Sequence, residues 1–180
     1  MSDFEARRGA APAARQILFL VFCIGNDRYA LQATDVVEVL PRMPLKPIAQ
    51  APSWVAGVFA WRGTVVPVID LCNLTFGQRA EARTSTRLVL VHYQPDDQQA
   101  RQVLGLILEQ ATGTLRCDPA QFQPCGLDNR QARYLGPVRE DAQGLLQWVR
   151  VDDLLDDSVR TMLFPTPPLS ADAFEAGHEQ

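Results

Sequence analysis

The side chains that most often carry catalysis are sparse in this sequence. Histidine occurs only twice in the 180 residues, at His92 and His178. Nucleophilic triads and zinc sites usually combine a histidine with a positioned serine, cysteine or carboxylate, and no such cluster occurs here. His92 lies within the apolar stretch 87–93, which predicts a structural histidine whose hydrogen bonds are satisfied within the fold. The sequence therefore predicts no catalytic residue.

Cysteine and aspartate form no recognisable metal or redox motif either. The cysteines make no C-x-x-C pair, and four aspartates near the C-terminus lack the alternating spacing of a calcium loop. We therefore expect buried, reduced thiols and a solvated acidic helix face. The phosphate-binding patterns G-x-G-x-x-G and G-x-x-x-x-G-K-[ST] do not occur, so no metal or cofactor site is predicted, and an enzyme with an unrecognised site is a weaker alternative. The residues concerned are Cys23, Cys72, Cys117, Cys125, Asp152, Asp153, Asp156 and Asp157.

One charged side chain is notable because its surroundings are apolar. The segment Val55–Leu71 is rich in β-branched residues and contains only two charges, Arg62 and Asp70. This composition predicts buried strands, and the break at Arg62-Gly63 predicts the turn of a hairpin, since glycine permits positive φ. Burying an unpaired guanidinium costs more than burying an apolar neighbour returns. Arg62 should therefore lie at the solvent rim, held by a carboxylate or offered to a partner.

The elements that would position this hairpin are mostly short strands separated by turn residues. Many short strands with turn signals between them predict a mainly β fold, a barrel or a sandwich. Besides the two strands of the hairpin, we expect strands at 17–24, 28–32, 87–93, 103–108, 133–138 and 145–151, with a separate segment at 113–116.

Three helices are also predicted. The first has Asp35 at its start and Glu38 three residues later, as in a capping box. The second is capped by Asp70 and stopped by Gly77. The third is amphipathic and closes the fold. These helices are expected at 35–40, 71–76 and 151–163.

The composition is that of an ordinary globular domain, with 47% hydrophobic and 21% charged residues. A net charge of −4 leaves no basic surplus to neutralise phosphates, which argues against nucleic-acid binding. The N-terminal segment lacks the apolar core of a signal peptide, and the apolar run at 17–24 is too short to span a bilayer, so we expect a cytoplasmic protein. We expect a disordered leader over 1–15, one domain over 16–164 and a flexible tail over 165–180.

Four stretches of the sequence resemble the CheW family of chemotaxis coupling proteins. GVFAWRGTVVPVIDL, which contains Arg62, is similar to the family signature, which runs roughly G-V-x-N-L-R-G-x-x-x-P-V-x-D-L. Three further stretches match the family in its own order along the chain. They are FLVFCIGNDRYALQATDVVEVL, VLGLILEQATG and LQWVRVDDLLD. The resemblance covers about residues 16–163.

The resemblance implies two SH3-like, five-stranded β-barrel subdomains around a shared core, with short helices and a C-terminal helix. It also implies a non-enzymatic adaptor that couples chemoreceptor cytoplasmic tips to the regulatory domain of a CheA-type histidine kinase. Such adaptors join rings with other CheW-like proteins and are recruited to membrane-bound receptor arrays. One barrel edge would dock on the kinase, and the groove between the barrels would take the receptor's helical hairpin.

Carried onto this chain, the family's contact residues are Val36, Glu38, Gly57 and Arg62, and Glu38 is the natural carboxylate partner of Arg62. Trp61 is added because an exposed tryptophan beside an arginine is typical of protein interfaces, although it would equally serve to fill the core.

Three residues depart from the family pattern. Ala60 and Trp61 replace an Asn-Leu pair, and Glu109 replaces an aspartate, which suggests an auxiliary chemosensory pathway. Two alternatives to the coupling adaptor remain. One is a small-barrel module that binds another ligand or nucleic acid, and the other is a CheW-like ring component that binds only the kinase.

Overall fold

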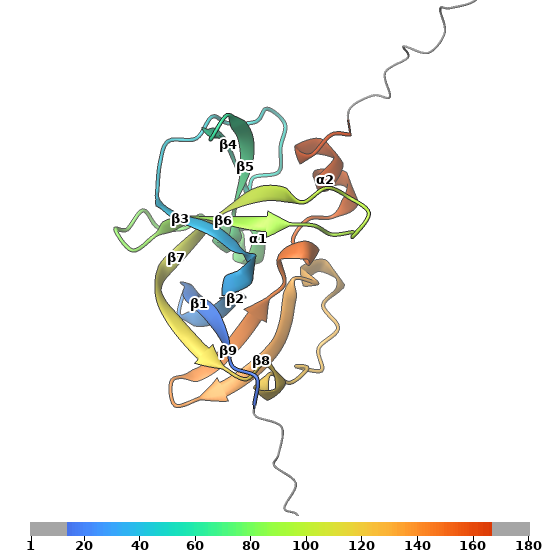
Figure 1. Ribbon diagram of the computed structural model, residues 1–180. Helices are drawn as coiled ribbons and strands as arrows, with labels where there is room; N and C mark the ends of the chain where they lie inside the picture. The colour runs from blue at the N-terminus through green and yellow to red at the C-terminus, as the bar shows by residue number, and fades with distance from the viewer. Residues whose placement is uncertain (1–13, 167–180) are drawn as a thin grey trace, which may run out of the picture.

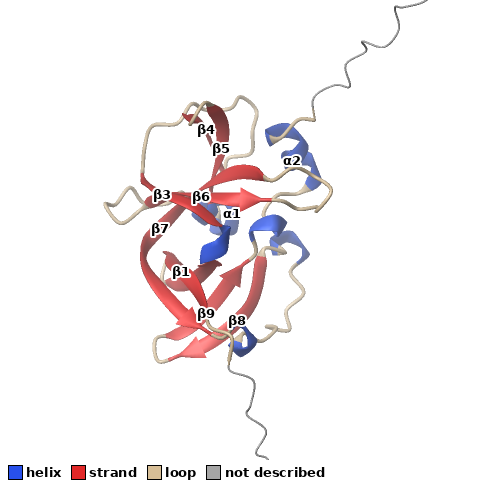
Figure 2. Ribbon diagram, viewed as in Figure 1, coloured by secondary structure: helices blue, strands red, loops and turns tan. Residues whose placement is uncertain are grey.

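The computed structural model describes residues 14–166, and β-strands make up most of its regular structure (Figures 1 and 2). The predicted leader and tail lie outside these residues, apart from the positions next to the domain. Within 14–166, no helix has the length and hydropathy needed to cross a bilayer. The elements are β1 (Ile17–Ile24), β2 (Asp27–Gln32), β3 (Val36–Pro41), β4 (Val55–Trp61), β5 (Thr64–Asp70), α1 (Leu71–Phe76), β6 (Arg87–Tyr93), β7 (Gln102–Cys117), β8 (Leu135–Asp141), β9 (Gly144–Val149) and α2 (Asp157–Leu163).

These strands form two subdomains of five strands each, which share β7. The strand order is β3–β6–β7–β5–β4 in subdomain one and β7–β1–β2–β9–β8 in subdomain two. The N-terminal part of β7 pairs with β5 and β6, and its C-terminal part pairs with β1. Figure 1 shows β7 running from one subdomain into the other. The arrangement confirms the predicted mainly β fold with two five-stranded subdomains.

Strand β7 is longer than predicted. It is one strand of 16 residues, where the sequence indicated a strand at 103–108 and a separate segment at 113–116. Its register with β1 shifts between Val21 and Cys23, and Gln110 takes a φ of +48° at this irregularity. A bulge bends a strand without ending it, which allows β7 to serve both sheets. The polar interruption in the sequence therefore marks a bulge.

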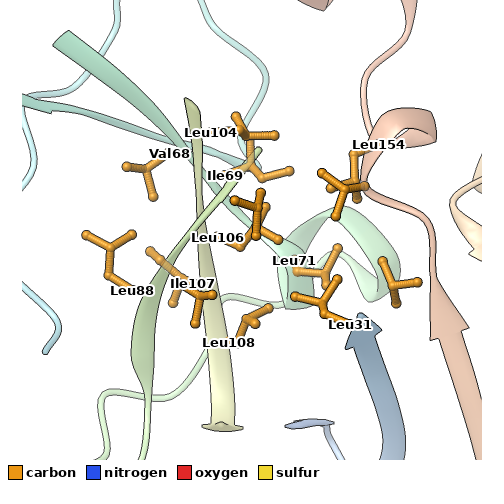
Figure 3. Packing of buried hydrophobic residues seen from close by; sticks show 14 of the residues in the cluster. Leu31, Val68, Ile69, Leu71, Leu88, Leu104, Leu106, Ile107, Leu108 and Leu154 are labelled. Carbon is orange, nitrogen blue, oxygen red and sulfur yellow. The ribbon is translucent and has the colours of Figure 1, made fainter. Parts of the chain in front are cut away.

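A single hydrophobic core cluster extends across both subdomains. Leu106 of β7 is fully buried, and in Figure 3 it lies among side chains from several elements, Leu31 of β2 and Leu154 among them. A smaller cluster fills the far part of subdomain two, where the ring centroids of Phe19 and Trp148 are 5.0 Å apart in an edge-on contact. Because the main cluster draws on both sheets, the two subdomains have a common core.

The cysteines follow the prediction in part. Cys72 and Cys117 are buried and Cys23 is half-buried, and all are free thiols. Burial raises the pKa of the Cys72 thiol to about 11, so it stays protonated at neutral pH. Cys125 is exposed, contrary to the prediction of buried thiols, because it lies in the loop that precedes β8.

The predicted helix at 35–40 is wrong. Residues Val36–Pro41 form strand β3, which pairs antiparallel with β6, and only Ala33–Asp35 make a single 3-10 turn. Three of the six residues of β3 are valine, whose branched side chains favour a pleated sheet over a helix. The pairing with β6 therefore overrides the capping-box pattern. Glu38 consequently lies on a strand.

The predicted helix at 151–163 is divided. Val151–Asp153 form a 3-10 turn, and α2 begins only at Asp157. The carboxylate of Asp156 caps α2 by accepting a hydrogen bond from the backbone N–H of Val159 at 2.8 Å. Asp152 instead accepts from the backbone N–H of Gln94 at 2.9 Å. Asp156 thus caps α2, while Asp152 ties the 3-10 turn to the end of β6.

An ion-pair cluster links β2 to β8. Arg28 donates to both carboxylate oxygens of Asp141, at 2.7 and 3.2 Å, and Arg139 lies 3.6 Å from the same carboxylate. The hydrogen bonds from Arg28 hold the pKa of Asp141 below its usual value.

We expect Asp141→Asn to lower the free energy of unfolding by about 1.5–3 kcal/mol at neutral pH, since it removes charged hydrogen bonds and leaves two arginines less well paired. A carboxyl with a depressed folded-state pKa stabilises the fold above its unfolded pKa, and this contribution is lost as the pH falls through the folded value. The difference in free energy of unfolding between the native protein and Asp141→Asn should therefore shrink below about pH 4. Urea denaturation from pH 3 to pH 7 measures it, and a constant difference over that range would contradict the assignment.

Candidate functional site at the β4–β5 hairpin

The hairpin of β4 and β5 has its turn at Arg62-Gly63, as predicted. Both turn residues have positive φ, +49° for Arg62 and +80° for Gly63. Two positive φ values in a two-residue turn match the twist of the flanking strands. Arginine adopts this conformation at a cost of about 1 kcal/mol. Backbone preference alone would therefore not select an arginine at this turn position.

The base of the hairpin is fixed by the predicted helix cap. The carboxylate of Asp70 accepts hydrogen bonds from the backbone N–H groups of Asn73, at 3.1 Å, and Ala80, at 2.9 Å. Helix α1 then ends at Gly77, which has a φ of +71°. Asp70 is 5% exposed, so this second charge of the apolar segment is buried but hydrogen-bonded. The hairpin is thereby anchored at its base, while its tip faces solvent.

Three of the predicted contact residues meet at the tip. The indole Nε1–H of Trp61 donates to Oε2 of Glu38 at 3.0 Å, and Nη2 of Arg62 donates to the same oxygen at 3.3 Å. The Arg62 guanidinium carbon lies 4.7 Å from the centre of the Trp61 ring, as in a cation–π contact. Since β3 and β4 are the two end strands of the subdomain-one sheet, these side chains connect edges that no strand pairing joins.

The exposure of these side chains is uneven. The Arg62 side chain is 71% exposed, whereas that of Glu38 is 34% exposed and Trp61 is partly buried against the core. Exposed ion pairs contribute at most about 1 kcal/mol to stability. The apolar side chains of Val39 and Val65, which neighbour this cluster in sequence, are also exposed, at 44% and 67%. The tip thus presents an exposed guanidinium that a carboxylate and an aromatic ring orient.

The other two predicted contact residues, Val36 and Gly57, are packed against other parts of subdomain one. Val36 is half-buried, packs against the core cluster and pairs with Val91 of β6. Gly57 is buried on β4 with a φ of +141°. A Cβ atom at Gly57 would lie 2.5 Å from the backbone oxygen of Lys46, within the segment that joins β3 to β4. Neither residue belongs to the hydrogen-bonded cluster of Glu38, Trp61 and Arg62.

Sequence reasoning anticipated the pairing of Glu38 with Arg62 but not the role of Trp61. The sequence favours neither the core nor an interface for Trp61. In the structure its ring packs against the core and its indole N–H donates to Glu38. The available signal was chemical, because a half-buried indole N–H usually finds an acceptor. What the sequence lacked was the information that β3 and β4 approach each other at this point.

His92 differs in detail from the prediction. It is half-buried on β6, and its Nδ1 has no hydrogen-bond partner among residues 14–166, so it is not the satisfied histidine expected from the sequence. Burial, and then the positive charge of Arg101, lowers its pKa. Within the same described residues, no three histidine, cysteine or carboxylate side chains gather closely enough to hold a metal ion.

A cleft of about 440 Å³ lies between Trp54 and Leu74 on one side and the 130–134 and 152–160 segments on the other. None of the five predicted contact residues lines it. The hairpin tip and this cleft are therefore different surfaces.

Comparison with known proteins identifies the family. The model of the CheW-like domain matches residues 18–159. The chain belongs to the CheW family. It is 26% identical over 162 residues to the chemotaxis protein CheW of Helicobacter pylori, a match that covers 84% of this chain and 93% of that protein. It is 32% identical over 132 residues to the protein FrzA of Myxococcus xanthus, covering 72% of this chain and 79% of FrzA.

The crystal structure of the scaffolding protein TtCheW from Thermoanaerobacter tengcongensis has the same fold. Its TM-score is 0.69 at 20% identity, and the match covers 82% of this chain and 92% of that one. The CheW-family membership, the relatives and the fold agree with the resemblance of the four sequence stretches. This chain is a coupling adaptor of chemosensory signal transduction.

Proposed function

We propose that the chain couples the cytoplasmic tips of chemoreceptors to the regulatory domain of a CheA-type histidine kinase, and that the hairpin tip carrying Arg62 is one of its contact surfaces. In this proposal the chain acts in the cytoplasm at membrane-bound receptor arrays and catalyses no reaction itself. Signalling then consists of a shift in the kinase's conformational population, which each partner biases through its contacts with the adaptor.

The observation that carries the proposal is the position of Arg62. Its side chain is 71% exposed, yet it is oriented by a carboxylate and an aromatic ring. An exposed ion pair adds little stability, so folding alone gives little reason for this arrangement. A pre-oriented side chain loses less conformational entropy on association, and arginine beside tryptophan is a combination enriched among residues that dominate binding energy.

Two apolar residues of subdomain one, Val39 on β3 and Val65 on β5, are also exposed. The cleft bounded by Trp54, Leu74 and the 130–134 and 152–160 segments is lined by charged residues of both signs and by none of the predicted contact residues. We therefore place the contact at the hairpin tip and not in that cleft.

The test measures two associations and one activity with the full chain. The chain is titrated separately against the kinase and against a receptor cytoplasmic hairpin, and kinase autophosphorylation is followed with receptor present, with and without the chain. We expect binding to both partners and a receptor-dependent change in kinase activity only when the chain is added. Binding to the kinase alone would overturn the coupling proposal in favour of a ring component. Binding to neither, or a mobility shift of a labelled oligonucleotide at physiological salt, would also overturn it.

A further inference from the structure

Trp61 holds the cluster at the hairpin tip together. It contacts both of the other residues and also packs against the core. We infer that Trp61 is a positioning residue, which keeps the Glu38 carboxylate in place so that Arg62 can leave it for a carboxylate on the partner. This inference rests on the proposed function, since it concerns how the same surface engages its partner.

The geometry separates the two donors to Glu38. Both hydrogen bonds end on Oε2, but that of Trp61 is shorter, 3.0 Å against 3.3 Å, and its ring is held by the core. Arg62 lies at the turn with a side chain that is 71% exposed, so its guanidinium is the donor that moves easily. Trp61 is thus the fixed donor and Arg62 the exchangeable one.

The burial of Glu38 explains why a fixed donor matters. About two-thirds of its side chain is covered, and residues 14–166 offer it no third hydrogen-bond donor. A largely covered carboxylate that loses its partners bears a desolvation penalty. With the indole N–H in place, Glu38 keeps one hydrogen bond when Arg62 departs. Without that N–H, each departure of Arg62 would leave the carboxylate unpaired and would weaken partner binding.

The chemistry of the Arg62 guanidinium indicates which group on the partner it binds after it leaves Glu38. A guanidinium presents several N–H donors in one plane, which match the two oxygens of a carboxylate. The Trp61 ring, whose centre lies 4.7 Å from the guanidinium carbon, stays beside Arg62 when Glu38 is exchanged. We therefore assign an aspartate or glutamate side chain on the partner protein as the group that replaces Glu38.

A double-mutant cycle tests this mechanism. Trp61→Phe keeps an aromatic ring and removes the N–H, and we expect it to weaken partner binding about three- to tenfold. In an Arg62→Ala background the same substitution should change the affinity less than about twofold, because Trp61 acts through Arg62. Arg83→Ala serves as the control, since Arg83 forms an exposed pair with Glu81 in the 78–86 loop, and it should leave the Trp61→Phe effect unchanged.

A second readout does not depend on binding. The indole Nε1–H resonance of Trp61, identified by its loss in Trp61→Phe, should shift in Glu38→Ala and stay close to its native position in Arg62→Ala. An equal Trp61→Phe effect with and without Arg62, no effect in either background, or an indole resonance insensitive to Glu38→Ala would each overturn the inference. Failure of Arg62→Ala to weaken binding would instead overturn the proposed contact surface, so the two failures are distinguishable.

Discussion

Replacing Gly57 with alanine is expected to lower the free energy of unfolding by about 3–5 kcal/mol, through backbone strain and overpacking together. At a φ of +141°, an L side chain is strained whatever space surrounds it. The added Cβ would also lie 2.5 Å from the Lys46 backbone oxygen and 3.1 Å from the Cβ of Leu45. That segment is bonded to β4 by two backbone hydrogen bonds between Lys46 and Val58, each 2.8 Å, which the substitution would disturb. Chemical denaturation measures the effect.

Gly113→Ala is the matched control. Gly113 lies on β7, and the nearest atom to an added Cβ there is the Cβ of Val21 at 3.9 Å, an ordinary contact. We expect this variant to stay within about 1 kcal/mol of the native protein. If the two variants are equally stable, the close approach at Gly57 does not constrain the fold. A large loss of stability at Gly57 alone would mean that the close approach to the Lys46 backbone constrains subdomain one.

Leu106→Ala is expected to destabilise the protein by about 2–5 kcal/mol, because it opens a cavity in the strand that both subdomains share. Leu106 is fully buried, pairs with Val89 of β6 and Ile69 of β5, and belongs to the cluster that both sheets contribute to (Figure 3). The native protein and the variant should each unfold in one transition, since neither subdomain retains a complete core alone. Tryptophan fluorescence and far-ultraviolet circular dichroism, followed during the same denaturation, measure this.

Val65→Ala provides the comparison for the core variant. Val65 is also an apolar residue of subdomain one, but its side chain is 67% exposed, so the change should stay within about 0.5 kcal/mol. Fluorescence and circular dichroism transitions that separate in Leu106→Ala would show that the subdomains unfold independently. That result would contradict the common core described above.

The parts of the fold that the sequence predicts are those with strong local signals. The turn at Arg62-Gly63 follows from a glycine between two β-branched runs, and α1 follows from Asp70 and Gly77 at its ends. These features depend on residues close together in the chain. The hairpin and its short helix could therefore be placed before any tertiary contact was known.

The errors arise where a tertiary contact decides between two local patterns. Residues 35–40 carry a capping-box spacing as well as a strand-forming valine run, and only the pairing with β6 selects the strand. Strand β7 continues through Gln110 because β1 pairs with it beyond the bulge. The same limit applies to the site. Glu38 and Arg62 could be paired by charge alone, but the Trp61 hydrogen bond requires knowing that β3 and β4 approach each other.

The most direct test of the account compares the affinity of Arg62→Ala with that of Arg83→Ala for the receptor tip and for the kinase. Both arginines are exposed and paired with a glutamate, so both substitutions should leave the thermal midpoint nearly unchanged. We predict that Arg62→Ala weakens binding to at least one partner by about tenfold or more, while Arg83→Ala binds both as the native chain does. Native affinity of Arg62→Ala for both partners, or unfolding of that variant with binding retained, would contradict the account.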